Sequence, residues 1–516
     1  MLSEEQYKEL CVVCDRILLA EDSKVECIAI PWLHIIREHP VFLNNYIDLF
    51  ASEHGIKAFV KSRLRRLRNL AVWFRQLGRS FYSKGQWWFS SKDISGPIDV
   101  LFVSHLVSES HVGQTDDFYF GELPDELVKQ GYTVVIALIN HSGGQSNLFA
   151  DKWKNNVVPR VILSGSLGIS EEINSHRRLK IESFRLRKLA SKETYSLFKK
   201  VFLRASLEAL SNASLTTLRM DKQIAALVAK LNPKAIVTTH EGHAWERITF
   251  SAARREIPEI RCLGYQHAAV FRLQHAIRRD LSTTYNPDRI LTAGTVSKLQ
   301  LEYMLSSEGR AISVLGSCRS FKGTCPSKEE LVMRSYNLTC LVIPEGIVSE
   351  CYLLFDFSLA CAQLFPEIQF IWRLHPIVDF ESLVTRNAKL RNLPRNIVLS
   401  QATLEEDSSR SCWALYRGSS AVVSTIMNGV RPIYLQMLGE MTIDPIYELE
   451  VWRKSATSIL DFKQIIQVDI DDNFASSEED LRLAQEYCES FYLFFNVDVL
   501  TSLILEKTTY DQHKST

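Results

Sequence analysis

The chain has 516 residues, of which 46% are hydrophobic and 23% charged, values typical of a soluble globular protein with two or three domains. Lysine plus arginine equal aspartate plus glutamate at 60 each, so no overall positive field favours nucleic acid as a partner. Eleven scattered cysteines, an odd number, indicate reduced thiols in a cytoplasmic protein, not a disulfide framework. We expect no signal peptide and no membrane-spanning helix, because charges interrupt the start of the chain and no run of about 20 apolar residues follows.

Residues 1–92 are predicted to be helical. Cys11 and Cys14 form an isolated C-x-x-C, interpreted as two apolar sulfurs on a helix. Between residues 61 and 92 there are nine Lys or Arg and no Asp or Glu. Helical spacing places apolar side chains on one face, namely Leu64, Leu67, Leu70, Ala71, Phe74, Leu77 and Phe81, and basic ones on the other, namely Lys61, Arg65, Arg68, Arg75 and Arg79.

This basic amphipathic segment ends in a cluster of aromatic residues, a pattern typical of an interfacial membrane anchor. The prediction is a peripheral contact of residues 61–92 with an anionic membrane surface on its cytoplasmic side. The alternative is a helix packed on the body with a solvated basic face. A nucleic-acid patch is a weaker alternative, since no nucleic-acid-binding module accompanies the segment.

From residue 93 onward, predicted strands alternate with helices, which favours an α/β protein with a parallel sheet in each half. We divide the chain into a helical region at 1–92, a first α/β domain at 93–325 and a second at 326–516. Residues 318–337 are predicted to be a hinge, and residues 170–230 a helical hairpin inserted in the first domain. Strands are predicted at residues 98–106, 133–139, 235–239, 260–265, 289–291 and 312–315, then at 338–343, 368–371, 396–399, 413–416 and 432–435.

The candidate chemistry of the first half follows the strand at 235–239, which opens into His240-Glu241-Gly242-His243 and then a helix. A carboxylate between two imidazoles at a strand end suits a general base. A metal site and a purely structural polar cluster are the alternatives. Gln266 and His267 end the next strand, and His105, Glu109 and His111 on a preceding loop are weaker candidates.

In the second half, the strand at 368–371 runs into Arg373 and His375, and Pro376 then ends it. His375 lies where open α/β sheets bind ligands, so it can hydrogen-bond or protonate a phosphate oxygen, unless it only caps the sheet edge. We assign Arg373, together with His375, to a candidate nucleotide-phosphate site. Strand alternation, however, places the Arg373 side chain on the opposite face of the sheet from its neighbours.

The strand at 413–416 opens into Gly418, Ser419 and Ser420 before a helix, which places hydroxyls and N–H groups at a natural phosphate seat. A simple N-cap pair is the alternative. Glu345 and Gly346 follow the strand at 338–343 and are expected beside this seat.

A carboxylate-Gly after one strand, a His-Pro after another and a Ser-Ser before a helix resemble three motifs of bacterial CMP-sugar glycosyltransferases. These are the sialyltransferases and the Kdo transferases of capsule assembly, which have the GT-B fold. Tyr265-Gln266-His267 is similar to the Gln-His-Gly of capsule Kdo transferases and of CDP-glycerol glycerophosphotransferases. The resemblance spans residues 98–440 by motif order. This chain departs from it at His240, where those sialyltransferases have a carboxylate, and at Ala268, where a glycine is usual.

The resemblance implies a GT-B-like fold, with two Rossmann-like domains facing a central cleft and the extra N-terminal helical region. It implies an inverting, metal-independent transferase that needs no cofactor and moves a sugar from a CMP-activated donor to a glycan or lipid-linked acceptor in surface polysaccharide biosynthesis. Glu241, with His240 or His243 in support, would be the base. His375, Ser419 and Ser420 would bind the leaving phosphate. The alternatives are a polyol-phosphate or UDP/GDP-sugar transferase of the same fold, or a non-catalytic assembly subunit.

Overall fold

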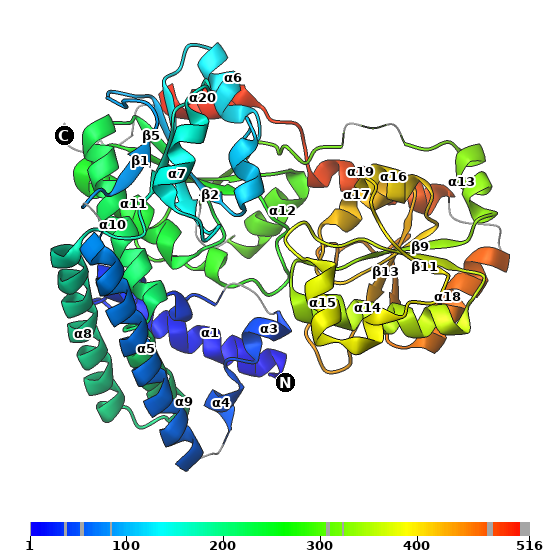
Figure 1. Ribbon diagram of the computed structural model, residues 1–516, viewed down its shortest axis with the longest axis horizontal. Coiled ribbons are helices and arrows are strands. Elements are labelled where there is room, and N and C mark those ends of the chain that lie inside the picture. Colours follow the sequence, from blue (N-terminus) through cyan, green and yellow to red (C-terminus); the bar gives the residue numbers. More distant parts are fainter. Residues whose placement is uncertain are drawn as a thin grey trace.

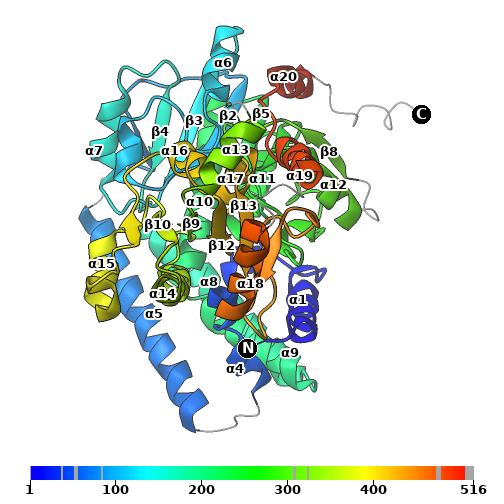
Figure 2. The same ribbon diagram turned by 90° about the vertical axis from the view of Figure 1, so that its right-hand side faces the viewer.

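The computed structural model describes residues 2–35, 39–51, 56–82, 85–305, 310–321, 323, 325–471 and 478–505 (Figure 1). Within them the chain forms two largely parallel β-sheets, each with helices on both faces (Figures 1 and 2). The expected α/β class with two Rossmann-like domains is therefore confirmed.

The first sheet has eight strands in the order β1-β4-β3-β2-β5-β6-β7-β8. All neighbours are parallel except β1, which pairs antiparallel with β4 at the edge. The strands are β1 Trp88–Ser90, β2 Val100–Leu106, β3 Val134–Asn140, β4 Arg160–Leu163, β5 Ala235–Thr239, β6 Arg261–Gln266, β7 Arg289–Thr292 and β8 Ala311–Val314.

The second sheet has six strands, all parallel to their neighbours, in the order β11-β10-β9-β12-β13-β14. Its strands are β9 Thr339–Ile343, β10 Gln369–Trp372, β11 Ile397–Leu399, β12 Trp413–Tyr416, β13 Arg431–Leu435 and β14 Lys454–Ala456. The second sheet starts at the central strand β9, and the parallel part of the first sheet starts at the central strand β2; from there the chain runs toward one edge and then returns to the other side of that strand. This order creates a topological switch point between β2 and β5 and another between β9 and β12, where open α/β sheets bind ligands.

Helices of the N-terminal half fall into three groups. The N-terminal region contains α1 Glu4–Leu18, α2 Val25–Ile28, α3 Pro40–Leu43, α4 Ile47–Phe50 and α5 Ile56–Tyr82. The inserted segment contains α8 Ile169–Lys192, α9 Ser196–Glu208 and α10 Asn212–Leu231. The first sheet is flanked by α6 Leu123–Lys129, α7 Ser146–Ala150, α11 Ala244–Glu256 and α12 Thr295–Met304.

The C-terminal half is built in the same way. Its helices are α13 Lys328–Ser335, α14 Val348–Leu364, α15 Phe380–Arg386, α16 Leu404–Ser409, α17 Ala421–Met427, α18 Ile459–Asp471, α19 Glu478–Phe491 and α20 Val497–Leu505. None of the helices in the described part of the chain is both long enough and apolar enough to cross a bilayer.

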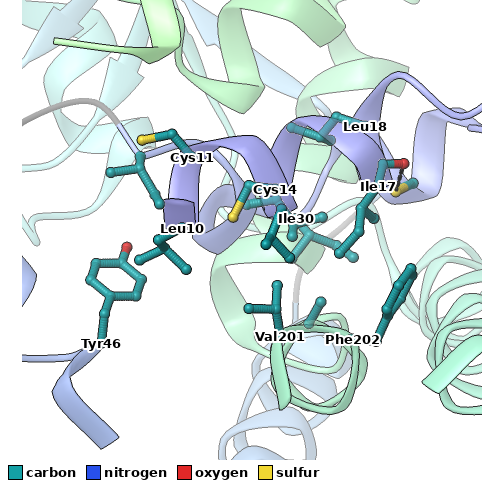
Figure 3. Close-up of a cluster of buried hydrophobic side chains, with 14 of the residues drawn as sticks. Leu10, Cys11, Cys14, Ile17, Leu18, Ile30, Tyr46, Val201 and Phe202 are labelled. Atoms are coloured by element: carbon teal, nitrogen blue, oxygen red, sulfur yellow. Dashed lines mark hydrogen bonds between the residues drawn. The ribbon is translucent and has the colours of Figure 1, made fainter. Parts of the chain in front are cut away.

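The central strands are continuous apolar runs because both faces of each sheet are covered. Val100, Leu101, Phe102 and Val103 of β2 are all fully buried, and they alternate between two separate core clusters. A third cluster joins the N-terminal helices to the inserted segment, where α1 lies against Val201 and Phe202 of α9 (Figure 3). Cys11 and Cys14 are buried there as free thiols, as the sequence indicated.

Four features differ from the sequence-based division. Strand β1, placed in the helical region, belongs to the first sheet, where it pairs with β4. Helix α20, placed in the second domain, packs with α6 in the core of the first. The expected hinge at 318–337 contains a helix, α13, and the expected hairpin at 170–230 is a set of three helices. Local periodicity shows where an element lies, and it cannot show which sheet a short strand or a returning helix joins.

Candidate functional site

The first switch point is formed by the loop His240–His243 between β5 and α11. Gly242 has a φ of +87°, a backbone conformation that favours glycine. A Cβ at this position would also collide with the backbone of Ala276. The glycine is therefore required for the sharp turn that carries Glu241 past the end of the strand.

Glu246, in the first turn of α11, holds this loop in place. Its buried carboxylate accepts the backbone N–H of Glu241 at 2.9 Å, of Gly242 at 2.7 Å and of His243 at 2.8 Å. These donors would otherwise be unsatisfied at a buried helix start. The conformation of the loop thus depends on one buried carboxylate in the following helix.

The Glu241 side chain contacts His243, with Nε2 of the imidazole 3.3 Å from Oε2 of the carboxylate. A carboxylate only accepts, so Nε2 carries the hydrogen in this contact. The other ring nitrogen can then accept, in agreement with the capping box that His243 and Glu246 form at the start of α11. His243 is partly exposed and orients the Glu241 carboxylate.

His240 is placed differently from the expectation that it shares the base role. It is fully buried, and its Nδ1 lies 3.2 Å from the Glu246 carboxylate. Burial lowers the pKa of His240, and Glu246 partly opposes this effect. The structure does not place His240 where it can contact a substrate, because its ring packs against Gly264 beneath the loop.

Two histidines that the sequence analysis ranked low or left aside line the same edge. His105 ends β2, and its ring nitrogens lie 2.9 Å from Nε2 of His141 and 3.1 Å from Oγ1 of Thr239. Burial lowers the pKa of His105 well below its usual value, and His141 and His267 lower it further. Burial also lowers the pKa of His141. Both rings are therefore neutral at pH 7 and act as hydrogen-bonding groups.

Aromatic rings surround this histidine group. The ring of His105 lies 5.4 Å from that of Tyr119 and 4.7 Å from that of Trp245. Tyr119 in turn lies 4.5 Å from His267, which follows β6. Gln266 is buried, and its amide donates to the carbonyl of Ala268, so it fixes its own loop. His267, rather than Gln266, is thus the residue of this pair that belongs to the histidine group.

The second switch point brings the loops after β9 and β12 together. A Cβ at Gly418 would collide with the Glu345 carboxylate, so only glycine permits the observed approach. His375 follows β10, and its Nδ1 lies 2.9 Å from the position of a Cβ on Gly346. Glu345, Gly346, His375 and Gly418 are therefore assembled at one place, as expected.

Arg417 stabilises this assembly through buried ion pairs. Its buried guanidinium donates to Glu350 of α14 at 2.7 Å and to Glu440, after β13, at 2.6 Å. A buried charge of this kind is tolerated only because it is paired and hydrogen-bonded. The contact fixes the start of α14 relative to the β12 loop.

His39 of the N-terminal region reaches this switch point. It is buried, and its Nε2 lies 3.2 Å from Glu345 and 3.9 Å from Glu350. Within the described ranges, these three residues are the group whose donor atoms approach closely enough to hold a metal ion. A cation there would lie beside the Arg417 guanidinium and would replace the His39–Glu345 contact. Electrostatics therefore favour a hydrogen-bonded bridge over a metal centre, and the His240-Glu241-His243 alternative gathers no such group.

His375 and the linker residue Arg319 lie close to each other. Burial lowers the pKa of His375, the positive charge of Arg319 lowers it further, and Glu345 opposes both. Arg319 is exposed and also acts electrostatically on Tyr265, in β6 of the first sheet. Among the described residues no carboxylate forms an ion pair with Arg319. The charge of Arg319 thus acts on residues of both sheets, on Tyr265 of β6 and on His375 after β10.

Ser419 and Ser420 are half-buried and precede α17. The simple N-cap alternative predicts a hydrogen bond from the helix to one of these hydroxyls. Ser420 occupies the N-cap position without making it, and neither hydroxyl bonds to another residue in the described part of the chain. Both hydroxyls are therefore available to a ligand.

Arg373 lies outside the group. Its guanidinium donates to the buried carboxylate of Asp407 at 2.9 Å and to the carbonyl of Ala402 at 2.6 Å. These contacts tie the end of β10 to α16, which agrees with the strand alternation and not with the grouping of Arg373 with the nucleotide site. His111, the weaker loop candidate, stacks on Phe118 at 4.5 Å.

Comparison with known proteins finds solved structures with a fold similar to that of this chain. No protein-family model matches the chain. No curated protein matches it either. A glycosyltransferase from Rickettsia africae ESF-5 is 13% identical, with 80% of this chain and 100% of that one covered and a TM-score of 0.46. The glycotransferase of kitacinnamycin is 11% identical, with 79% and 99% covered and a TM-score of 0.45. MnaA of S. aureus in complex with UDP is 10% identical, with 80% and 99% covered and a TM-score of 0.43. Similarity at this level assigns no residue role.

The role of Glu246 can be tested by Glu246→Ala. The substitution leaves three backbone N–H groups without their acceptor, each costing about 1–3 kcal/mol if it stays buried. We expect amide hydrogen exchange at residues 241–243 to rise by at least about tenfold, with a lower melting temperature. The control is Glu256→Ala at the exposed end of the same helix, which should change neither quantity. Unchanged exchange at residues 241–243 in Glu246→Ala would contradict the assigned role.

Proposed function

We propose that the protein is a glycosyltransferase that binds a nucleotide-sugar donor at the second switch point and activates an acceptor hydroxyl at the first. The observation that carries this proposal is the pairing of two different chemistries. A carboxylate–imidazole pair follows β5, hydroxyl and imidazole donors follow β12 and β10, and the charge of Arg319 acts on a residue of each sheet.

The second switch point suits the phosphate of a nucleotide. Ser419 and Ser420 offer two hydroxyls without partners among the described residues, and His375 offers a ring N–H. Its Nδ1 accepts weakly from the N–H of Ile377 at 3.4 Å, so the neutral ring carries its hydrogen on Nε2. Arg319 supplies a positive charge nearby. The Glu345 carboxylate would repel phosphate, and it fits instead the hydroxyls of a ribose.

The first switch point suits deprotonation of an acceptor. In the proposed step the acceptor oxygen bonds to the anomeric carbon while the bond from that carbon to the phosphate oxygen breaks. The hydroxyl proton passes to Glu241, and the electron pair of the broken bond leaves on the phosphate. A single displacement of this kind inverts the configuration. His243 holds the carboxylate in place through the contact described above.

Stabilisation of the departing phosphate requires no metal ion in this scheme. Arg319 and the donors of His375, Ser419 and Ser420 meet the developing negative charge directly. A CMP-activated donor, a glycan or lipid-linked acceptor and a role in surface polysaccharide synthesis are the finer parts of the proposal. They rest on the order of the carboxylate-Gly, His-Pro and Ser-Ser motifs. The neutral charge of the chain gives no support for nucleic acid.

The donor side is tested with the double substitution Ser419→Ala/Ser420→Ala. Hydrogen bonds to a charged group contribute about 1.5–3 kcal/mol each, so nucleotide affinity should fall by at least about tenfold. Calorimetric titration with CMP, CDP, UMP, UDP, GDP and ADP measures the affinity, and CMP is expected to bind best. The control is Ser424→Ala, one turn further along α17. Equal affinity in the double variant and the control would show that Ser419 and Ser420 do not bind the phosphate. Tighter binding of UDP or GDP than of CMP would indicate a UDP- or GDP-sugar donor instead.

The acceptor side is tested with Glu241→Gln, which keeps the shape and removes the base. General-base catalysis contributes about 10²–10⁴-fold, so turnover of the preferred nucleotide sugar should fall by that factor while its affinity stays near that of the wild type. Product formation is followed by release of the free nucleotide. Wild-type turnover in Glu241→Gln would rule out Glu241 as the base, whereas no turnover by the wild type itself would favour a non-catalytic assembly subunit.

The lowered pKa of His375 gives a pH prediction. The imidazole is neutral at pH 7, because its pKa is lowered from the usual histidine value of about 6.5. It gains a proton only at a pH below that value, and the proton adds a positive charge beside the phosphate. Nucleotide affinity should therefore rise more between pH 7.5 and pH 5.5 in the wild type than in His375→Gln. Comparing the two proteins with the same nucleotide cancels the titration of the ligand itself. Parallel pH profiles would show that His375 does not face the phosphate.

A further inference from the structure

Helix α5 packs on the protein through its polar side. Asn69 donates to the carbonyl of Leu207 at 3.1 Å, and Gln76 donates to the carbonyl of Gly165 at 2.6 Å. Ser80 accepts from Ser166 at 2.7 Å, and Trp73 stacks on His176 of α8 with centroids 4.3 Å apart. The inward face of α5 thus consists of amides, a hydroxyl and one indole.

The apolar side of α5 points the other way. Leu64 is 60% exposed, Leu67 63%, Leu70 45% and Phe74 61%. Their spacing of three and four residues makes one continuous stripe along the helix. Helix α5 is packed on the body with its basic face in solvent, as the alternative from the sequence has it, and its apolar stripe is exposed as well. A helix that buries amides and exposes leucines is reversed relative to an ordinary surface helix.

Helix α8 extends this surface. It packs alongside α5 (Figure 1), and its Ile181 and Phe184 are 67% and 70% exposed. We call the exposed side chains Leu64, Leu67, Leu70 and Phe74 of α5 with Ile181 and Phe184 of α8 the apolar face. Clustered exposure of large apolar side chains over two helices marks an interaction surface more than scattered single residues would.

Positive charge surrounds the apolar face. Helix α5 contains no acidic residue, and its exposed arginines include Arg66, Arg68, Arg75 and Arg79. Lys180 and Lys188 of α8 are exposed as well. The chain as a whole has a formal charge of zero, so this charge is local.

We propose that the apolar face docks on an anionic lipid bilayer, with the leucine and phenylalanine side chains at the acyl boundary and the arginines among the headgroups. The charge decides between occupants. A second copy placed on this face would bring two copies of α5, neither with an acidic residue, against each other, whereas anionic headgroups complement their arginines, at about 1 kcal/mol per basic residue near the surface. The inference does not depend on the proposed function.

The test is sedimentation of the full chain with vesicles of neutral phosphatidylcholine or of phosphatidylcholine with anionic phosphatidylglycerol. We expect binding to the anionic vesicles that weakens as salt is raised. Leu67→Ser/Phe74→Ser and, separately, Arg68→Glu/Arg75→Glu should each lower the bound fraction by at least about tenfold. All four side chains point into solvent, so both variants should keep the wild-type melting temperature.

Matched controls change the same chemistry elsewhere. Leu438→Ser removes an exposed leucine of the second domain, and Lys389→Glu/Arg391→Glu reverses two exposed charges there. Both controls should bind vesicles like the wild type. Binding that is absent in the wild type, or equal in the α5 variants and the controls, would overturn the proposal. A dimer that the α5 variants convert to a monomer, without vesicle binding by the wild type, would assign the face to a second copy instead.

Discussion

The arrangement of both strand-end loops depends on one constraint, which is that a buried charge must be matched by hydrogen bonds. The Glu246 carboxylate meets it with three consecutive backbone N–H groups, and the Arg417 guanidinium meets it with Glu350 and Glu440. In each case the buried group is anchored beside a helix start and fixes a loop at the switch point of its sheet. Glu241 at the end of one sheet and Ser419 at the end of the other take their positions from these buried partners.

Much of this fold follows from local pattern. The strand at 413–416 is found at the predicted residues because a short apolar run bounded by turn residues has few other solutions in a buried sheet, and the same holds for 235–239. The candidate loops follow from those strands. His375, Gly418 and Glu345 assemble because parallel strands place their carboxyl ends on one edge.

Other parts of the site arise only from tertiary contacts. His39 lies about 300 residues from Glu345 in sequence, and nothing in its local sequence indicates the bridge. Arg319 lies in the segment expected to be a hinge, and only the structure shows that its charge acts on both Tyr265 and His375. In the sequence analysis, His105 is a weaker site candidate on a loop. The continuous apolar run before it nevertheless indicates that it lies at the end of a central strand. The orientation of α5 could not be predicted from the sequence either. Periodicity shows that a helix has an apolar and a polar face, but it does not show which face packs on the protein.

The N-terminal region connects the two surfaces. It carries α5 with its exposed apolar stripe, and it also carries His39, which contacts Glu345 at the switch point of the second sheet. In its described residues the region thus provides both an outward-facing surface and a contact with the second sheet.

The central claim, that a nucleotide binds at the switch point of the second sheet, is tested most directly by amide hydrogen exchange with and without the nucleotide that binds best. The account predicts slower exchange at residues 345–346 and 417–420 and around His375, with residues 241–243 unchanged in the absence of an acceptor. Protection confined to the first sheet, or spread away from both strand ends, would contradict it.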